Sequence, residues 1–239
     1  MRYQGPPLAS GGWAITPCTP WALPRIPHER WKCHFPFCAF SRSHCLEGGI
    51  LTRHQGTLPL ETPRLLLRPF VSADAPAAFR NWTGDARVTT FLRWPTHTDV
   101  TVTQHVIDDW VAQYGNPAFY QWAIVLKDLG EPIGSISVVD SNERTDMLHI
   151  GYCIGSRWWK QGYTSEAFAR VIAFAFDQIG AQRIESQHDP DNPASGRVMQ
   201  KCGLTCEGTL RRADWSNRGI VDACLYALLV QDYDINTAR

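Results

Sequence analysis

The segment from Ile150 to Ala167 holds the residue types best suited to chemistry in this chain. It is typical of a strand, a short polar loop and the start of an amphipathic helix. The first backbone N–H groups of a helix have no partner within it and lie at the positive end of its dipole, so they suit a phosphate. Gly162 lets an anion approach the backbone, and Lys160 adds positive charge. The residues alone predict an anion site, with a plain glycine turn as the alternative.

The same segment resembles the acetyl-coenzyme A signature of the GNAT superfamily of N-acetyltransferases, and within it the RimJ/RimL-type branch. In that branch a strand ending in Ile-Gly-Tyr leads to Trp-x-x-Gly-Tyr and then to a Glu-Ala pair in the helix. The matching positions are Trp159, Gly162, Tyr163, Glu166 and Ala167. The chain departs from the broader superfamily pattern at Trp159, where Gln or Arg is usual, and at Thr164, where Gly or Ala is usual. The resemblance implies acetyl-CoA as co-substrate and no metal.

Two further blocks extend this resemblance. The residues 192–195 (Asn-Pro-Ala-Ser) and 201–204 (Lys-Cys-Gly-Leu) are similar to the family's late helix and the strand after it, and residues 60–65 to its opening strand. The implied fold class is α/β (α+β): a mixed, mostly antiparallel sheet, splayed between strands 148–154 and 183–187, with helices on both faces. The pantetheine arm would lie beside the first of these strands and the pyrophosphate on the loop after it. The expected acetyl-CoA contacts are Ile154, Trp159, Lys160, Gln161, Gly162, Tyr163, Thr164 and Asn192.

Direct acetyl transfer to an amine needs a base for the amine's proton and an acid for the departing thiolate. In the branch that the chain resembles, the residue before Ile-Gly-Tyr is frequently a glutamate base. Here it is His149, which as a neutral imidazole can accept a proton or can be merely a strand residue. The position of the family's usual acid, a tyrosine, is Met199, so the candidate acid is Ser195, whose alternative role is to bond the helix backbone. Cys153 is interpreted as a small buried residue.

The hydrophobic patterns predict the elements that position these residues. A helix is expected from Ser72 or Asp74 through Trp82, and another, capped by Asp99 or Thr101, with an apolar stripe at Val102, Val106, Trp110 and Tyr114. A long helix is expected over 165–179, and a later one has Asn192 as its cap. The expected strands are 64–70, 120–126, 133–139, 148–154, 183–187, 205–210 and 221–229.

The composition favours a globular domain, with 44% hydrophobic residues and a formal net charge of zero that does not favour a nucleic-acid partner. No long apolar run and no signal peptide are seen, so we expect a cytoplasmic protein without a membrane partner. Residues 1–56 are predicted to be a disordered extension and 57–239 the GNAT domain. The cluster of Cys33, His34, Cys38, His44 and Cys45 matches no zinc template.

Two acceptor classes follow equally from the resemblance: a protein N-terminal amine, or a small-molecule amine such as a polyamine or an antibiotic amino group. Residues 81–116 and the loop 214–219 are expected to select the acceptor. A homodimer is compatible with this interpretation. The alternative function, from another class, is a module that binds acetyl-CoA without turnover, because the usual tyrosine and glutamate are missing.

Overall fold

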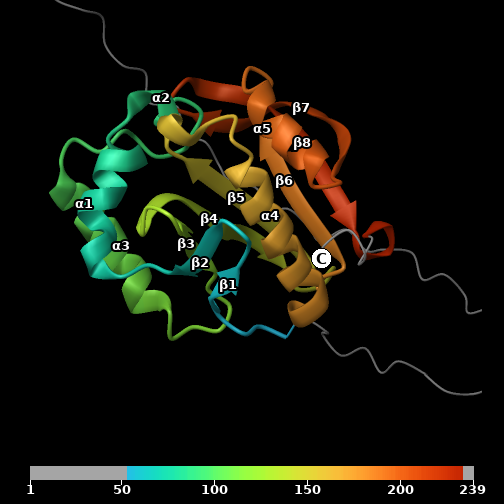
Figure 1. Cartoon of the computed structure of the whole chain (residues 1–239). Helices are drawn as coiled ribbons and strands as arrows, with labels where there is room; N and C mark the ends of the chain where they lie inside the picture. Colours follow the sequence, from blue (N-terminus) through green and yellow to red (C-terminus); the bar gives the residue numbers. More distant parts are fainter. Residues whose placement is uncertain (1–52, 234–239) are drawn as a thin grey trace, which may run out of the picture. The chain divides into compact units, whose positions relative to one another are not determined.

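The computed structural model of this chain describes residues 53–233, which form one mixed sheet with helices on both faces (Figure 1). The eight strands lie in the order β1-β2-β3-β4-β5-β6-β8-β7. All neighbouring strands are antiparallel except β5 and β6. The mostly antiparallel sheet predicted from the resemblance is therefore confirmed. The strand bounds are β1 Leu60–Glu61, β2 Leu65–Pro69, β3 Gln121–Leu126, β4 Glu131–Asn142, β5 Met147–Ile154, β6 Arg183–His188, β7 Thr205–Ser216 and β8 Gly219–Leu229.

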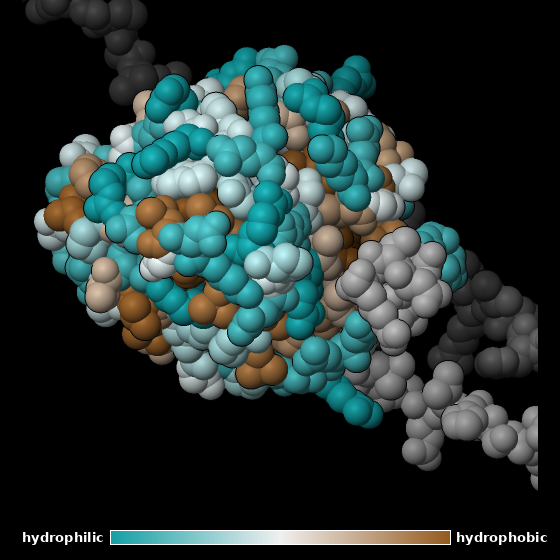
Figure 2. Space-filling view, in the orientation of Figure 1, coloured by the Kyte–Doolittle hydropathy of each residue, from teal (hydrophilic) through white to brown (hydrophobic). Residues whose placement is uncertain are grey.

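The central strand β3 is buried on both sides because a helical layer packs on each face of the sheet. Trp122 and Ile124 belong to the core on one face, whereas Ala123 and Val125 belong to the core on the other. In the orientation of Figure 1, hydrophilic residues cover most of the visible surface and hydrophobic residues show in separate patches (Figure 2).

The helices divide between the two faces. The long helix α4 (Tyr163–Phe174), which continues as a π-helical turn, contacts β1, β2 and β5, whereas α1 (Ala75–Ala78) contacts β4 and α3 (Val100–Gln113). The short helix α2 (Ala86–Thr89) leads toward α3, and α5 (Pro193–Lys201) packs on β6, β7 and β8. The expected helix over 72–82 is broken into a 3-10 turn, α1 and a π-helical turn, with proline at the second position of α1.

The predicted apolar stripe of α3 is wrong in part. Asp99 caps this helix as expected, since its carboxylate accepts from the N–H groups of Thr101 and Val102. The fully buried side chains, however, are Thr103 and Ile107, and Val102 is 38% exposed. The fully buried pair lies one residue, or about 100° around the helix, from Val102 and Val106, whereas Trp110 and Tyr114 of the predicted stripe do pack against the core.

The described part of the domain begins before the predicted boundary at residue 57. The Arg53 N–H donates to the Ile179 carbonyl, and the Gln55 N–H donates to the Tyr120 hydroxyl. Residues 53–56 thus share in the packing of the domain. The Cys and His cluster of the N-terminal segment lies outside the described residues. Within the described residues, we find no helix long and apolar enough to cross a membrane and no group of His, Cys, Asp or Glu that could hold a metal ion.

The sheet splays where the resemblance implies. The parallel pair β5 and β6 aligns only Met147 with Arg183, Leu148 with Ile184, and His149 with Glu185. Beyond these pairs, the Ser186 hydroxyl still donates to the Ile150 carbonyl at 2.8 Å. The rest of β5 has no strand partner on that side, and this separation makes room for a cavity.

Candidate active site

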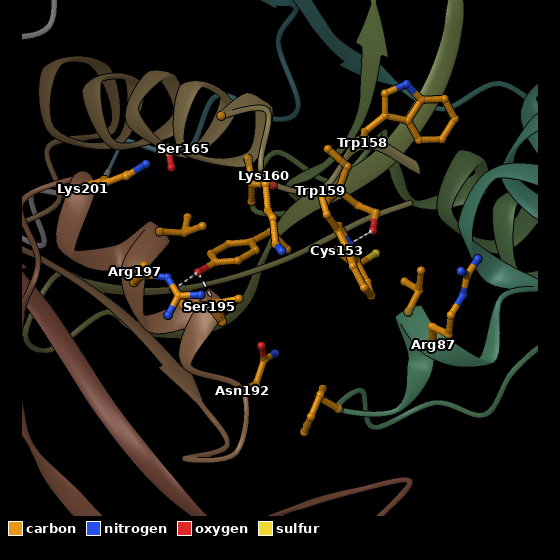
Figure 3. A pocket seen from close by; sticks show the side chains of 18 of the residues that line it. Arg87, Cys153, Trp158, Trp159, Lys160, Ser165, Asn192, Ser195, Arg197 and Lys201 are labelled. Carbon is orange, nitrogen blue, oxygen red and sulfur yellow. Dashed lines mark hydrogen bonds between the residues drawn. The ribbon is translucent and has the colours of Figure 1, made fainter. Parts of the chain in front are cut away.

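A cavity of about 400 Å³ lies at the free end of β5 (Figure 3). One wall is α5 with the residue before it, from which Ser195 and Asn192 approach the cavity, and the opposite wall is the α2 segment that carries Arg87 (Figure 3). The loop between β5 and α4 closes a third side. The cavity therefore joins the two regions that the sequence assigns to the cofactor and to the acceptor.

Most of the residues predicted as functional meet at this cavity. Those that line it are Ile154, Trp159, Lys160, Gly162, Thr164, Asn192 and Ser195. Gln161, Tyr163 and His149 are not among the described residues of its lining. Tyr163 instead packs against the core under α4, with the Arg64 guanidinium 4.3 Å from the centre of its ring.

The loop before α4 has the backbone shape of an anion site. Lys160 and Gly162 both have left-handed backbone conformations, with φ of 62° and 83°. No side chain caps the first turn of α4, which begins at Tyr163. A Cβ built on Gly162 would meet no described atom closer than the Arg64 guanidinium at 3.5 Å, so the protein itself does not fill this space. The uncapped N–H groups and the open space fit a pyrophosphate.

Arg64 and Glu166 hold this loop in place through hydrogen bonds to its backbone and to the chain before β2. Glu166 accepts from the Thr62 hydroxyl at 2.6 Å, and Arg64 Nε donates to Glu166 Oε2 at 2.6 Å. Arg64 also donates to the Gln161 carbonyl at 3.1 Å. Burial raises the pKa of Glu166, but the hydrogen bonds from Thr62 and Arg64 outweigh it and the net pKa is lowered. The Glu-Ala motif therefore anchors the loop to the start of β2.

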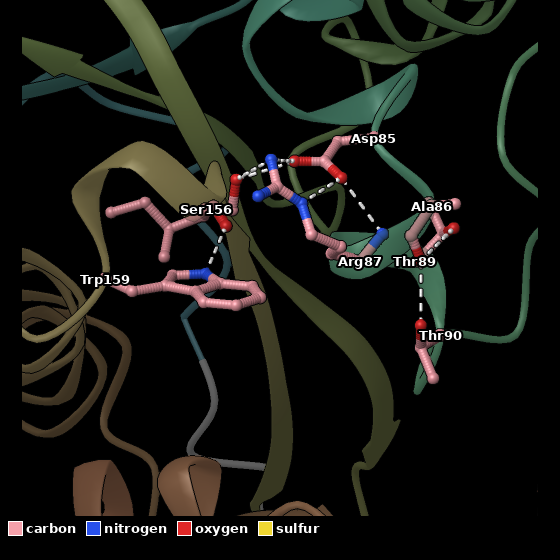
Figure 4. A network of polar contacts seen from close by, with 8 residues as sticks. Asp85, Ala86, Arg87, Thr89, Thr90, Ser156 and Trp159 are labelled. Atoms are coloured by element: carbon pink, nitrogen blue, oxygen red, sulfur yellow. Dashed lines mark hydrogen bonds and ion pairs between the residues drawn. The ribbon is translucent and has the colours of Figure 1, made fainter.

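The basic residues of the cavity differ in what neutralises them. Arg87 is paired with Asp85, and both bond the Ser156 hydroxyl (Figure 4). Lys160, Arg197 and Lys201 also line the cavity and make no ion pair with any described acid. The last two are four residues apart and so lie on one face of α5. Unpaired positive charge at the cavity fits the phosphate groups of acetyl-CoA.

The side chain of Trp159 hydrogen-bonds a backbone carbonyl at the end of β5. Its indole N–H donates to the Ile154 carbonyl at 3.0 Å (Figure 4), while 44% of the residue stays exposed. The pantetheine arm was expected to bond backbone near Ile154. In this structure that carbonyl already has one intramolecular donor, which leaves it a single further lone pair for the arm.

Ser195 has a partner that sequence reasoning missed. The Tyr152 hydroxyl lies 3.0 Å from Ser195 Oγ and donates to the Ser195 carbonyl at 3.1 Å. Burial raises the pKa of Tyr152, with the Ser195 hydrogen bond opposing. The phenol therefore stays protonated and can donate. Tyr152 is the last residue of the Ile-Gly-Tyr motif, which was the available signal. Asn192 precedes α5 as expected, but the prediction of a side-chain cap is wrong because its amide makes no capping bond and lies at the cavity.

His149 lies outside the cavity lining, on the face of β5 that also carries Cys153. Its Nδ1 is 3.8 Å from the Glu185 carboxylate, and its side chain is 14% exposed. Burial lowers the pKa of His149, and the charge of Glu185 opposes this effect. Residues four apart in a strand are separated by about 13 Å, so only water could connect His149 with the cavity wall at Cys153.

A family model described as an acetyltransferase (GNAT) domain matches residues 64–205, which is more than half of the chain. The chain belongs to the GNAT acetyltransferase family. The uncharacterized N-acetyltransferase YoaA of Bacillus subtilis (strain 168) is 30% identical to this GNAT chain over 170 residues, which are 71% of this chain and 96% of that protein. This GNAT protein is accordingly an acetyltransferase, and its family uses acetyl-CoA.

Solved GNAT structures share the fold. The GNAT-family acetyltransferase of Bacillus anthracis has a TM-score of 0.65 and 23% identity, covering 73% of this chain and 99% of its own. The microcin C7 self-immunity acetyltransferase MccE, solved in complex with acetyl-CoA and AMP, has a TM-score of 0.64 and 18% identity, covering 70% of this chain and 93% of its own. These likenesses confirm the GNAT fold of the splayed sheet.

Proposed function

We propose that this GNAT domain transfers an acetyl group from acetyl-CoA to a primary amine by direct attack, as in the RimJ/RimL-type branch. The observation that carries the proposal is the cavity itself, which reaches from an uncapped helix start with unpaired basic residues to the α2 segment on the opposite side. One substrate can enter from each end. Their reactive groups then meet at the free end of β5, where proximity replaces a covalent enzyme intermediate.

The loop and α5 bind the phosphate end of acetyl-CoA. The N–H groups at the start of α4 and the Lys160 ammonium hold the pyrophosphate, and Arg197 and Lys201 add attraction for the remaining phosphate. Acetyl-CoA supplies an activated thioester carbonyl. The role of Arg64 and Glu166 is to keep the loop in the conformation that presents these donors.

Two protons must move when the amide C–N bond forms and the thioester C–S bond breaks. Ser195 donates one to the departing thiolate. The Tyr152 hydroxyl, 3.0 Å from Ser195 Oγ, then turns from the Ser195 carbonyl to return a proton to Oγ, and solvent in the cavity reprotonates the phenol. His149 accepts the amine's proton through water, since its lowered pKa leaves the imidazole neutral at pH 7. No side chain of the domain acts as nucleophile. Cys153 bonds Ser135 and has a raised pKa because it is buried, so it does not form a reactive thiolate.

The test is thiol release from acetyl-CoA by the full chain, with peptides and small amines as separate acceptors. We expect release that depends on an amine, and mass spectrometry should find that amine heavier by one acetyl group. Binding of acetyl-CoA without release for any acceptor would instead support the non-catalytic module. Release with peptides alone would identify a protein N-terminus as the acceptor, and release with small amines alone would identify the second class.

A further inference from the structure

We propose that the acceptor is a monoamine with an apolar group next to its amine, and that polyamines and aminoglycosides are excluded. This inference rests on the proposed function and concerns the α2 side of the same cavity. Three features carry it: the charges of the cavity lining, the pairing of the nearby carboxylates, and an apolar wall that is fixed in position.

The cavity offers no carboxylate to a second ammonium group. None of its described lining residues is Asp or Glu, whereas Arg87, Lys160, Arg197 and Lys201 are all basic. A polycationic acceptor would have to strip water from its second ammonium group with no carboxylate in the lining to replace it, which is unfavourable. Arg87 is already paired with Asp85, and the other three basic residues serve the phosphates of acetyl-CoA. A monoamine can enter because its amine must lose its charge in order to react.

The carboxylates around the α2 side each have an arginine partner within the domain, and Arg218 and Arg183 each hold two of them. Asp214 accepts from Arg93 at 2.8 Å and from Gln187 at 2.6 Å. Arg218 donates to Asp189 at 3.0 Å and to Asp191 at 2.6 Å. The remaining pairs are Asp85 with Arg87 and Glu185 with Arg183. A polyamine would therefore compete with an arginine for each of these carboxylates.

The wall of the cavity on this side is apolar. Val88, Phe91 and Leu92 line it from α2 and the segment after it, and Cys153 faces it from β5. Val88 is 8% exposed and packs in the core of this face. Contact with such a wall favours an acceptor whose amine adjoins a hydrocarbon group. Burial of each additional methylene should raise kcat/KM about fourfold until the space is filled.

The turn between β7 and β8 holds this wall in place. The Asn217 side-chain amide donates to the carbonyls of Thr89 and Trp94, both at 2.8 Å, and its backbone N–H donates to the Leu92 carbonyl at 3.0 Å. The Arg218 guanidinium lies 5.4 Å from the centre of the Phe91 ring. The apolar surface thus exists before the acceptor arrives, so binding does not have to order it.

The first test compares acceptors that differ by one charge. Hexylamine and 1,6-diaminohexane have the same carbon chain, and spermidine and kanamycin extend the polycation series. At fixed acetyl-CoA, we expect kcat/KM for hexylamine to exceed that for the diamine at least tenfold. Among the monoamines, kcat/KM should rise from ethylamine through butylamine to hexylamine. A diamine or spermidine used as well as hexylamine would overturn the inference while leaving the proposed function intact. Thiol release that does not depend on any added amine would refute both the inference and the proposed function.

The second test changes the charge of the wall. Leu92→Asp should lower the preference for hexylamine over the diamine at least tenfold, because it adds an unpaired carboxylate. Leu210→Asp is the matched control, since Leu210 is an exposed residue of β7 outside the cavity lining, and it should leave the preference unchanged. Phe91→Ala provides a milder variant that should flatten the dependence on chain length at unchanged acetyl-CoA affinity. An unaltered preference in folded Leu92→Asp and unaltered chain-length dependence in Phe91→Ala would remove this wall from the acceptor site.

Discussion

The hydrogen bond between Tyr152 and Ser195 makes the sharpest prediction. Tyr152→Phe removes only the hydroxyl, which lies 3.0 Å from Ser195 Oγ, and keeps the ring that packs 5.3 Å from that of Phe168. A net loss of about 0.5–1.5 kcal/mol of stability is expected for the hydroxyl's bonds. For a domain of this size, that corresponds to a fall in Tm of roughly 1–6 °C. The fold should persist, and acetyl-CoA affinity should stay within about twofold of wild type.

The effect on catalysis should be much larger if the hydroxyl pair supplies the thiolate's proton. Loss of a general acid costs about 10² to 10⁴ in rate, so Ser195→Ala should lower kcat by that order. Tyr152→Phe should lower kcat by at least tenfold, because Ser195 keeps its own hydroxyl but loses the donor behind it. The double variant should be no slower than Ser195→Ala, since both residues act on one proton.

The assay is steady-state thiol release with the best acceptor, together with thermal melting and calorimetry for acetyl-CoA. Burial raises the pKa of Tyr152, so its hydroxyl stays protonated beyond the pH at which a free phenol ionises. The wild-type kcat should therefore show no loss at that pH. A Tyr152→Phe enzyme with lower Tm but wild-type kcat would refute the relay and leave the hydroxyl a purely structural role. Fully additive losses in the double variant would refute the shared proton path.

Four further predictions concern the loop, the strand histidine and the turn. Gly162→Ala should lower the free energy of unfolding by about 1–2 kcal/mol, because alanine disfavours the left-handed backbone there. It should also weaken acetyl-CoA binding at least tenfold, as measured by calorimetry. Gly130→Ala is the control: with φ of 70° and open space around it, it should carry the same cost in stability at unchanged acetyl-CoA affinity. His149→Ala should lower kcat/KM about 10² to 10⁴ fold without changing acetyl-CoA affinity, and a wild-type rate would make the residue structural. Because burial lowers the pKa of His149, stability should fall as pH drops from 6.5 toward the folded-state pKa, and His149→Gln should reduce this fall in acid melts. Asn217→Ala leaves the carbonyls of Thr89 and Trp94 without their side-chain donor and should lower the free energy of unfolding by roughly 1–3 kcal/mol. It should raise the KM of the acceptor and leave the Kd of acetyl-CoA unchanged. A raised Kd of acetyl-CoA alone would contradict the assignment of Asn217 to the acceptor wall.

The sequence could predict the elements that depend on local pattern. The strands 120–126 and 148–154 are found within one residue of the observed β3 and β5, because their apolar runs are bounded by polar turns. The splayed pair and the cavity loop followed from motif resemblance, and local pattern alone indicated only an anion site. The α3 stripe was right for Trp110 and Tyr114, which pack against the core, and wrong for Val102, which is exposed.

Contacts between distant segments could not be read from the chain. Tyr152 and Ser195 are 43 residues apart, and Asn217 reaches Thr89 across 128 residues. Their partners are decided by the sheet order, which places β7 and β8 beyond β6. The pairing of the acceptor-side carboxylates has the same origin. The composition gives only a net charge of zero, so it could not show which carboxylates have an arginine partner.

The short parallel pairing of β5 with β6 has a consequence for how the domain opens. Strand pairing between the two parts of the sheet is confined to Met147–His149 and Arg183–Glu185, with backbone hydrogen bonds from Gln182 and Arg183 to the Asp146 carbonyl at its edge. The part made of β6, α5, β7 and β8 can therefore exchange its amide hydrogens as one cooperative unit, at a free energy below that of global unfolding. Acetyl-CoA would touch both α4 and α5 across this junction. Its binding should slow exchange throughout the C-terminal unit, including strands that the ligand never contacts.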